Sequence, residues 1–68
     1  MGIAINTIRV GLKYVLTNYG ETHKFQVIEA LEEGNFKVKD METLEIYELE
    51  DLIRYGEGKD FEILEIEE

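Results

Sequence analysis

The chain has 68 residues, 44% of them hydrophobic, which is enough for one small domain with a single core. Its formal net charge is −9, and the absence of cysteine excludes a disulfide framework and a thiolate zinc site. No run approaches the ~20 apolar residues that span a bilayer, and the first residues show no secretory pattern. We therefore expect one cytoplasmic domain over residues 1–68 that does not associate with membranes.

The charge is unevenly distributed along the chain. Residues 1–39 hold five bases and four acids, a net charge of +1, whereas residues 40–68 hold two bases and twelve acids, a net charge of −10. A negative field repels phosphate backbones and anionic lipid headgroups. We therefore expect no nucleic acid partner and no membrane partner. A basic protein or peptide is the expected partner, unless the acids simply form the solvated faces of strands.

The clearest strand pattern covers residues 8–16, where every even position is apolar. A period of two predicts one buried face and one solvated face, with Tyr14 in the core. Residues 1–7 contain an apolar alternation in the opposite phase, so they form either a loose arm or an extra edge strand. Residues 17–21 contain Asn and Gly and predict a turn, because both accept positive φ.

Residues 22–33 are compatible with a bent strand or with a helix. Phe25 and Val27 share one strand face, whereas Ile28 and Ala30 share the other. On a helical wheel the apolar side chains spread over most of the circumference and form no stripe. A strand is therefore favoured, with a bulge where the apolar phase changes and a hairpin turn at the glycine that follows.

A second hairpin is predicted over residues 35–47, with its turn at residues 41–43. The register that best satisfies burial sets Val38 opposite Leu44, and a shift by one residue would place Val38 against an acid. The same register pairs Phe36 with Ile46 on the buried face and Lys37 with Glu45 on the solvated face.

Helical spacing replaces the strand pattern at Leu49, Leu52 and Ile53, which share one face of a single turn. The glycines that follow end this turn, and residues 61–66 return to a strand pattern. The sequence therefore predicts an all-β fold with one short helical turn before the last strand.

The sequence offers no arrangement for catalysis. It contains neither serine nor cysteine as a nucleophile, and its one histidine, His23, has no second histidine at a metal-ligand spacing. The acids around the turn at Asp40, Glu42 and Glu45 lack the spacing and the glycine of an EF-hand loop. We therefore expect that the protein is not an enzyme and has no catalytic, metal or cofactor site.

Tyrosines mark the candidate surface for a partner. Tyr19 and Tyr55 lie in or beside glycine-marked turns, and Tyr47 lies on a strand near the acidic turn. Tyrosines beside acids are typical of surfaces that bind basic or proline-rich peptides, although they can also cover the ends of a fold with their hydroxyls in water. The candidate partner-binding residues are Tyr19, Tyr47, Tyr55, Asp40, Glu42 and Glu45.

The order of elements over residues 24–66 resembles the SH3-like barrels, including their Tudor-like and translation-associated members. The segments that carry the resemblance are residues 25–27, 36–40, 43–47, 50–52 and 61–63. The most characteristic part is the Asp51-Leu52 pair inside a short helical turn before the last strand. The resemblance implies a small five-stranded SH3-like barrel, a fold that usually binds peptides, modified side chains or nucleic acid. The chain lacks the basic face of the nucleic-acid-binding members, and it lacks a four-aromatic cage.

Two functions are compatible with these features. The first is a small, acidic, non-catalytic interaction module that binds a protein or basic peptide, as a monomer or a weak homodimer. The alternative is a structural or regulatory subunit of a homo-oligomer or larger complex. In that case residues 1–7 would add a strand, because an unpaired apolar edge invites association.

Overall fold

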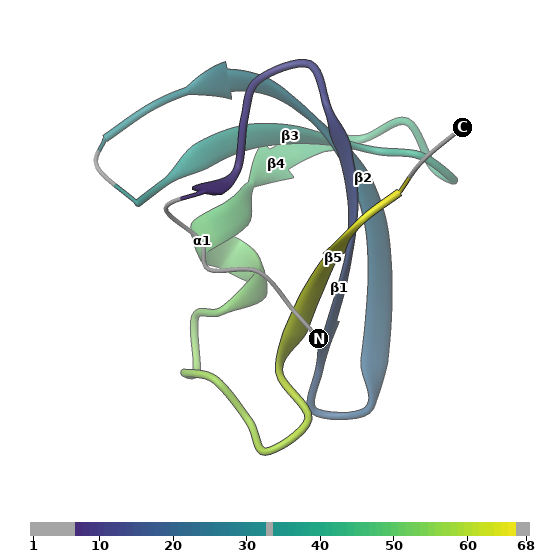
Figure 1. Cartoon of the computed structure of the whole chain (residues 1–68), viewed down its shortest axis with the longest axis vertical. Helices are drawn as coiled ribbons and strands as arrows, with labels where there is room; N and C mark the ends of the chain where they lie inside the picture. Colours follow the sequence, from purple (N-terminus) through teal and green to yellow (C-terminus); the bar gives the residue numbers. More distant parts are fainter. Residues whose placement is uncertain (1–6, 33, 67–68) are drawn as a thin grey trace.

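The dominant feature of the computed structural model, which describes residues 7–32 and 34–66, is one antiparallel sheet of five strands. In chain order the elements are β1 (Lys13–Asn18), β2 (Glu21–Ala30), β3 (Phe36–Asp40), β4 (Ile46–Glu48), α1 (Leu49–Leu52) and β5 (Glu62–Glu65). The strand order across the sheet is β4-β3-β2-β1-β5 (Figure 1). The predicted all-β class and the short helical turn before the last strand are confirmed. Apart from Thr7, the predicted arm or edge strand at residues 1–7 lies outside the described residues.

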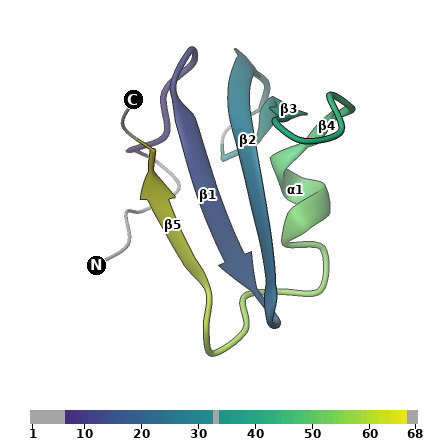
Figure 2. The same ribbon diagram turned by 90° about the vertical axis from the view of Figure 1, so that its right-hand side faces the viewer.

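The sheet is open, so the prediction of a closed barrel is wrong. In the described part of the chain, β4 and β5 are the two outer strands and do not pair with each other. The reason is the length of β4, which has three residues and passes directly into α1, so the chain leaves the sheet early. Figure 2 shows β5, β1 and β2 side by side, with α1 on the side of β3 and β4.

The first strand begins at Lys13. The sequence pattern predicted a start at Ile8, so this boundary is wrong. Gly11 interrupts the alternation with a φ of +94°, in the left-handed region that favours glycine. Its N–H donates to the carbonyl of Val27 at 2.8 Å, which ties this turn to β2. Ile8 is buried even though it lies outside the strand. Tyr14 is buried as predicted.

The second strand bends at a bulge, as the change of apolar phase predicted. The register of β2 with β3 shifts between Val27 and Glu29. Ile28 is the additional residue and is exposed, whereas Phe25 and Val27 are buried. Strand β2 covers residues 21–30, so the helix alternative is excluded. In Figure 1 the sheet changes direction here, from the vertical β1 and β5 to β3 and β4 across the top.

The register of β3 with β4 differs from the predicted one. Val38 pairs with Tyr47 rather than with Leu44. The Asp40 carboxylate accepts hydrogen bonds from the turn that follows it, which makes the connection longer than the predicted three residues. Because the shift is an odd number of residues, the two faces of the strand are exchanged. Tyr47 packs against the core, whereas Leu44 and Ile46 are exposed.

The core lies between the inner face of the sheet and α1. Tyr14 and Phe25 lie at its centre, with ring centroids 6.2 Å apart. Phe36 and Phe61 are half-buried against it. In the described residues the buried hydrophobic side chains are Ile8, Tyr14, Leu16, Phe25, Val27, Val38, Leu49 and Ile63.

Candidate functional site

The turn between β1 and β2 is bound to the loop that follows α1. Asn18 is buried, and its Oδ1 accepts from the N–H of Gly58 at 2.7 Å. The Asp60 carboxylate accepts from the N–H groups of Tyr19 and Gly20, both at 2.8 Å. A carboxylate that accepts several N–H groups is stabilised in its charged form, and the pKa of Asp60 is lowered accordingly. Two segments that are distant in sequence are thereby fixed against each other.

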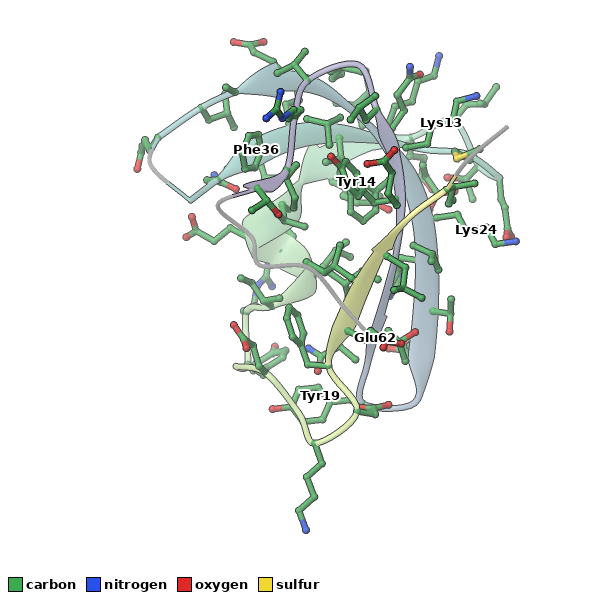
Figure 3. All side chains as sticks on the ribbon, viewed as in Figure 1. Lys13, Tyr14, Tyr19, Lys24, Phe36 and Glu62 are labelled. Atoms are coloured by element: carbon green, nitrogen blue, oxygen red, sulfur yellow. The ribbon has the colours of Figure 1, made fainter. Side chains whose placement is uncertain are left out.

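Tyr19 is held in one orientation although its side chain is 57% exposed. Its hydroxyl donates to the carbonyl oxygen of Tyr55 at 2.9 Å. Its ring lies against Gly58, where an added Cβ would come within 2.9 Å of two ring atoms. Figure 3 shows the Tyr19 side chain extending from the β1–β2 turn toward the loop after α1. Tyr19 also has a φ of +50°, an unfavourable value for a residue other than glycine.

Tyr19 and Tyr55 line a recess of about 230 Å³ at the end of the inner face of the sheet. Tyr55 is 83% exposed, so its ring is available to a ligand. The remaining lining residues come from β1, β2 and α1, and they are Asn18, Glu21, His23, Asp51 and Leu52.

The two carboxylates of this tyrosine recess differ in their partners. Asp51 accepts from the Arg54 guanidinium at 3.1 Å with Oδ1 and from the N–H of Glu48 at 3.2 Å with Oδ2. Hydrogen bonds to Asp51 and then to Tyr55 raise the pKa of Arg54. Glu21 is exposed and has no ion pair within residues 7–32 and 34–66. Glu21 is therefore the recess carboxylate that a basic ligand could reach.

The other predicted binding residues lie at the turn between β3 and β4. Asp40 accepts from the N–H groups of Glu42 at 2.7 Å and Thr43 at 2.9 Å, and from the Tyr47 hydroxyl at 3.0 Å. The N–H groups of Thr43 and Glu42 hold the pKa of Asp40 below its usual range. Burial, followed by the hydrogen bond to Asp40, raises the pKa of Tyr47. Tyr47 is half-buried and stabilises this turn, whereas Glu42 and Glu45 are exposed.

The six predicted residues therefore form two groups. Tyr19 and Tyr55 line the tyrosine recess, whereas Tyr47 and the three acids lie at the β3–β4 turn. His23 also lines the tyrosine recess. The sequence-based prediction missed His23 and Glu21. Both lie on the inner face of β2, so the period of two could have identified them.

No protein-family model, curated protein or solved structure matches this chain. In the part of the chain that the structure describes, no group of three or more His, Cys, Asp or Glu side chains is placed to hold a metal ion. No buried side-chain nitrogen or oxygen there lacks a hydrogen-bond partner, and no described helix has the length and apolar character needed to cross a membrane. The tyrosine recess, with its two tyrosines and Glu21, is the candidate site on the inner face.

Proposed function

We propose that the protein is a non-catalytic interaction module whose tyrosine recess binds a basic segment of a partner protein. The observation that carries this proposal is the Tyr19 side chain, which is exposed, fixed by a hydrogen bond and attached to a strained backbone. A strained backbone conformation persists only where the surrounding structure enforces it, and such conformations are common at ligand-binding positions.

The chemistry of the recess suits a lysine or arginine side chain. A cation over an exposed tyrosine ring contributes roughly 0.5–1 kcal/mol, and Glu21 supplies a carboxylate beside the rings. The net charge of −9 draws basic partners and increases their rate of association. Because Tyr19 is already ordered, little conformational entropy is lost when a ligand binds.

A kinship with SH3-like barrels is part of the same proposal. The short helix between β4 and β5 supports it, whereas the open sheet counts against it. The absence of serine and cysteine from the sequence supports a role other than covalent catalysis.

The proposal can be tested by fluorescence anisotropy with a labelled peptide of alternating arginine and proline residues. We expect Tyr55→Ala to weaken binding about two- to fivefold, because it removes the more exposed ring. Glu21→Gln should weaken binding about two- to fivefold. Its matched control is Glu57→Gln, which removes the same charge from an exposed loop residue outside the recess. Equal losses from the two glutamate variants would mean that net charge alone attracts the peptide, and would contradict the proposal.

A second candidate function is that of a structural subunit in an assembly. The observation that favours it is the open sheet, whose outer strands β4 and β5 carry the exposed side chains Ile46 and Leu64. Light scattering on the full chain and on a version lacking residues 1–7 tests this function. Monomer masses for both proteins would contradict it.

A further inference from the structure

The face of the sheet directed away from α1, here called the outer face, carries most of the lysines. Strand alternation puts Lys13, Lys24 and Lys39 on this face, opposite the buried Tyr14. Lys13 pairs with Gln26, which in turn pairs with Lys39, so the three side chains form one row across the sheet. Figure 3 shows Lys13 and Lys24 on the side of the sheet away from α1.

The outer face carries a row of lysines although the whole chain is strongly acidic. It holds four of the five lysines in the sequence. Lys37 forms an ion pair with Glu29, with Nζ and Oε1 3.4 Å apart. Lys24 and Lys39 have no ion pair among residues 7–32 and 34–66. The row of Lys13 and Lys39 is therefore locally positive, although Glu48 on β4 and Glu62 on β5 lie on the same face of the sheet.

The β3–β4 turn lies against the outer face and forms a recess of about 200 Å³ with it. The apolar lining comes from Met41 and Leu44, and the basic lining from Lys13 and Lys39. The complete lining, here called the lysine recess, is Lys13, Gln26, Lys39, Asp40, Met41 and Leu44. The Asp40 carboxylate already accepts two hydrogen bonds from its own turn and one from the Tyr47 hydroxyl on β4.

Leu44 adds an exposed apolar side chain to the lysine recess. Its φ is +65°, a conformation that a leucine adopts rarely, and its side chain is 63% exposed. Ile46 is also exposed and pairs with Lys39 across the β3–β4 ladder. Two large apolar side chains therefore lie exposed beside the lysine row. A partner that carried only charged groups would leave these two side chains in contact with water.

We propose that the outer face binds an extended acidic segment of a partner protein, in which carboxylates alternate with apolar side chains. A carboxylate of this segment would enter the lysine recess beside Lys13 and Lys39, and its apolar neighbours would cover Leu44 and Ile46. Charge complementarity selects the acidic side chains. A long nucleic acid fits less well, because the acidic remainder of the protein repels a polyanion and phosphates offer no apolar contact.

The experiment uses fluorescence anisotropy with a labelled peptide of alternating glutamate and leucine residues. A glutamine-for-glutamate peptide and a single-stranded oligothymidine serve as comparison probes. Lys39→Gln should weaken binding of the acidic peptide about two- to fivefold. Lys59→Gln is the matched control, because it removes the same charge from an exposed residue on a distant loop and should leave the affinity unchanged. Amide NMR shifts should change at Lys13, Gln26 and Lys39 and leave Tyr55 unaffected.

Four outcomes would overturn this proposal. The first is the absence of saturable binding by the glutamate–leucine peptide, and the second is an equal loss of affinity from Lys59→Gln. Tighter binding of oligothymidine would identify the face as a nucleic acid surface. A dimeric mass without peptide, reduced to the monomer by Lys39→Gln, would show that a second copy of the chain occupies the face. The arginine–proline peptide binds another face in our proposal, so its failure would leave these expectations unchanged.

Discussion

Two non-glycine residues in the described chain have a left-handed backbone conformation, Tyr19 at φ +50° and Leu44 at φ +65°. This conformation costs roughly 1–2 kcal/mol for a residue with a side chain. Both residues are exposed, and each lines one of the two recesses. A strained backbone therefore coincides twice with a large exposed side chain at the edge of a recess.

We predict that Leu44→Asn stabilises the protein and weakens binding of the acidic peptide. Asparagine adopts positive φ at lower cost, so the free energy of unfolding should rise by about 0.5–1 kcal/mol. Urea denaturation followed by circular dichroism measures this change. Ile46→Asn is the control, because Ile46 is a similarly exposed apolar residue on a β-strand without positive φ. Stabilisation by both variants would show that exposure, rather than backbone strain, is the cause.

At the scale of elements, the contact between the β1–β2 turn and the loop after α1 determines the tyrosine recess. Three side chains make this contact: Asn18 and Asp60 through hydrogen bonds to the backbone, and Tyr19 through its hydroxyl and ring. The recess therefore depends on two elements packing together and not on either element alone.

We predict that Gly58→Ala destabilises this contact. The new Cβ would lie 2.9 Å from two ring atoms of Tyr19, and overpacking of this kind costs about 1–3 kcal/mol. In a Tyr19→Ala background the same substitution should cost much less. A double-mutant cycle measured by urea denaturation gives this coupling directly. Additive effects of the two substitutions would contradict the proposed packing.

The features that the sequence predicts correctly are those set by local periodicity. The bulge in β2 follows from the change of apolar phase at Ile28, and α1 follows from the spacing of Leu49, Leu52 and Ile53. The lysines of the outer face also follow a period of two, and could have been grouped by applying that period to the charged residues.

The features that the sequence does not predict depend on hydrogen bonds between side chains and distant backbone. The register of β4 is set by the Asp40 carboxylate, which extends the turn and reverses the strand faces. The tyrosine recess depends on Asn18 and Asp60, whose partners lie about forty residues away. A pattern of apolar residues contains no information on either interaction. The same limit explains why the sequence pattern groups Tyr47 with Tyr19, although the two side chains lie in different places.

For the whole molecule, the net charge of −9 does not describe every surface, because a row of lysines crosses one face of the sheet. The outer face carries the row of Lys13 and Lys39, whereas the tyrosine recess and α1 carry Glu21, Glu50 and Asp51. Under the two proposals, a basic segment binds on one side of the protein and an acidic segment on the other. The two proposals together describe a small adaptor between partners of opposite charge, and each can be tested alone.

The stability of the whole molecule should fall in acid through the two turn-binding carboxylates, Asp40 and Asp60. Each has a pKa below its usual value because it accepts backbone N–H groups, chiefly from Thr43 for Asp40 and from Gly20 for Asp60. A carboxyl whose pKa is lower in the folded state stabilises the fold above its unfolded pKa of about 3.9. That stabilisation is lost as the pH falls through the folded pKa.

We therefore predict that Asp60→Asn lowers the free energy of unfolding at neutral pH and that the difference from the wild type narrows steadily below about pH 4. Urea denaturation across a pH series measures the free energy of unfolding of both proteins.

Glu57→Gln is the control, because Glu57 is an exposed loop carboxylate with no hydrogen bond or ion pair in the described part of the chain. Its curve of unfolding free energy against pH should run parallel to that of the wild type. A difference for Asp60→Asn that stays constant from neutral pH to strong acid would show that the shape of the side chain, and not its charge, holds the β1–β2 turn. Convergence of the Asp60→Asn and wild-type curves in acid would instead show that the contact that forms the tyrosine recess accounts for the loss of stability at low pH.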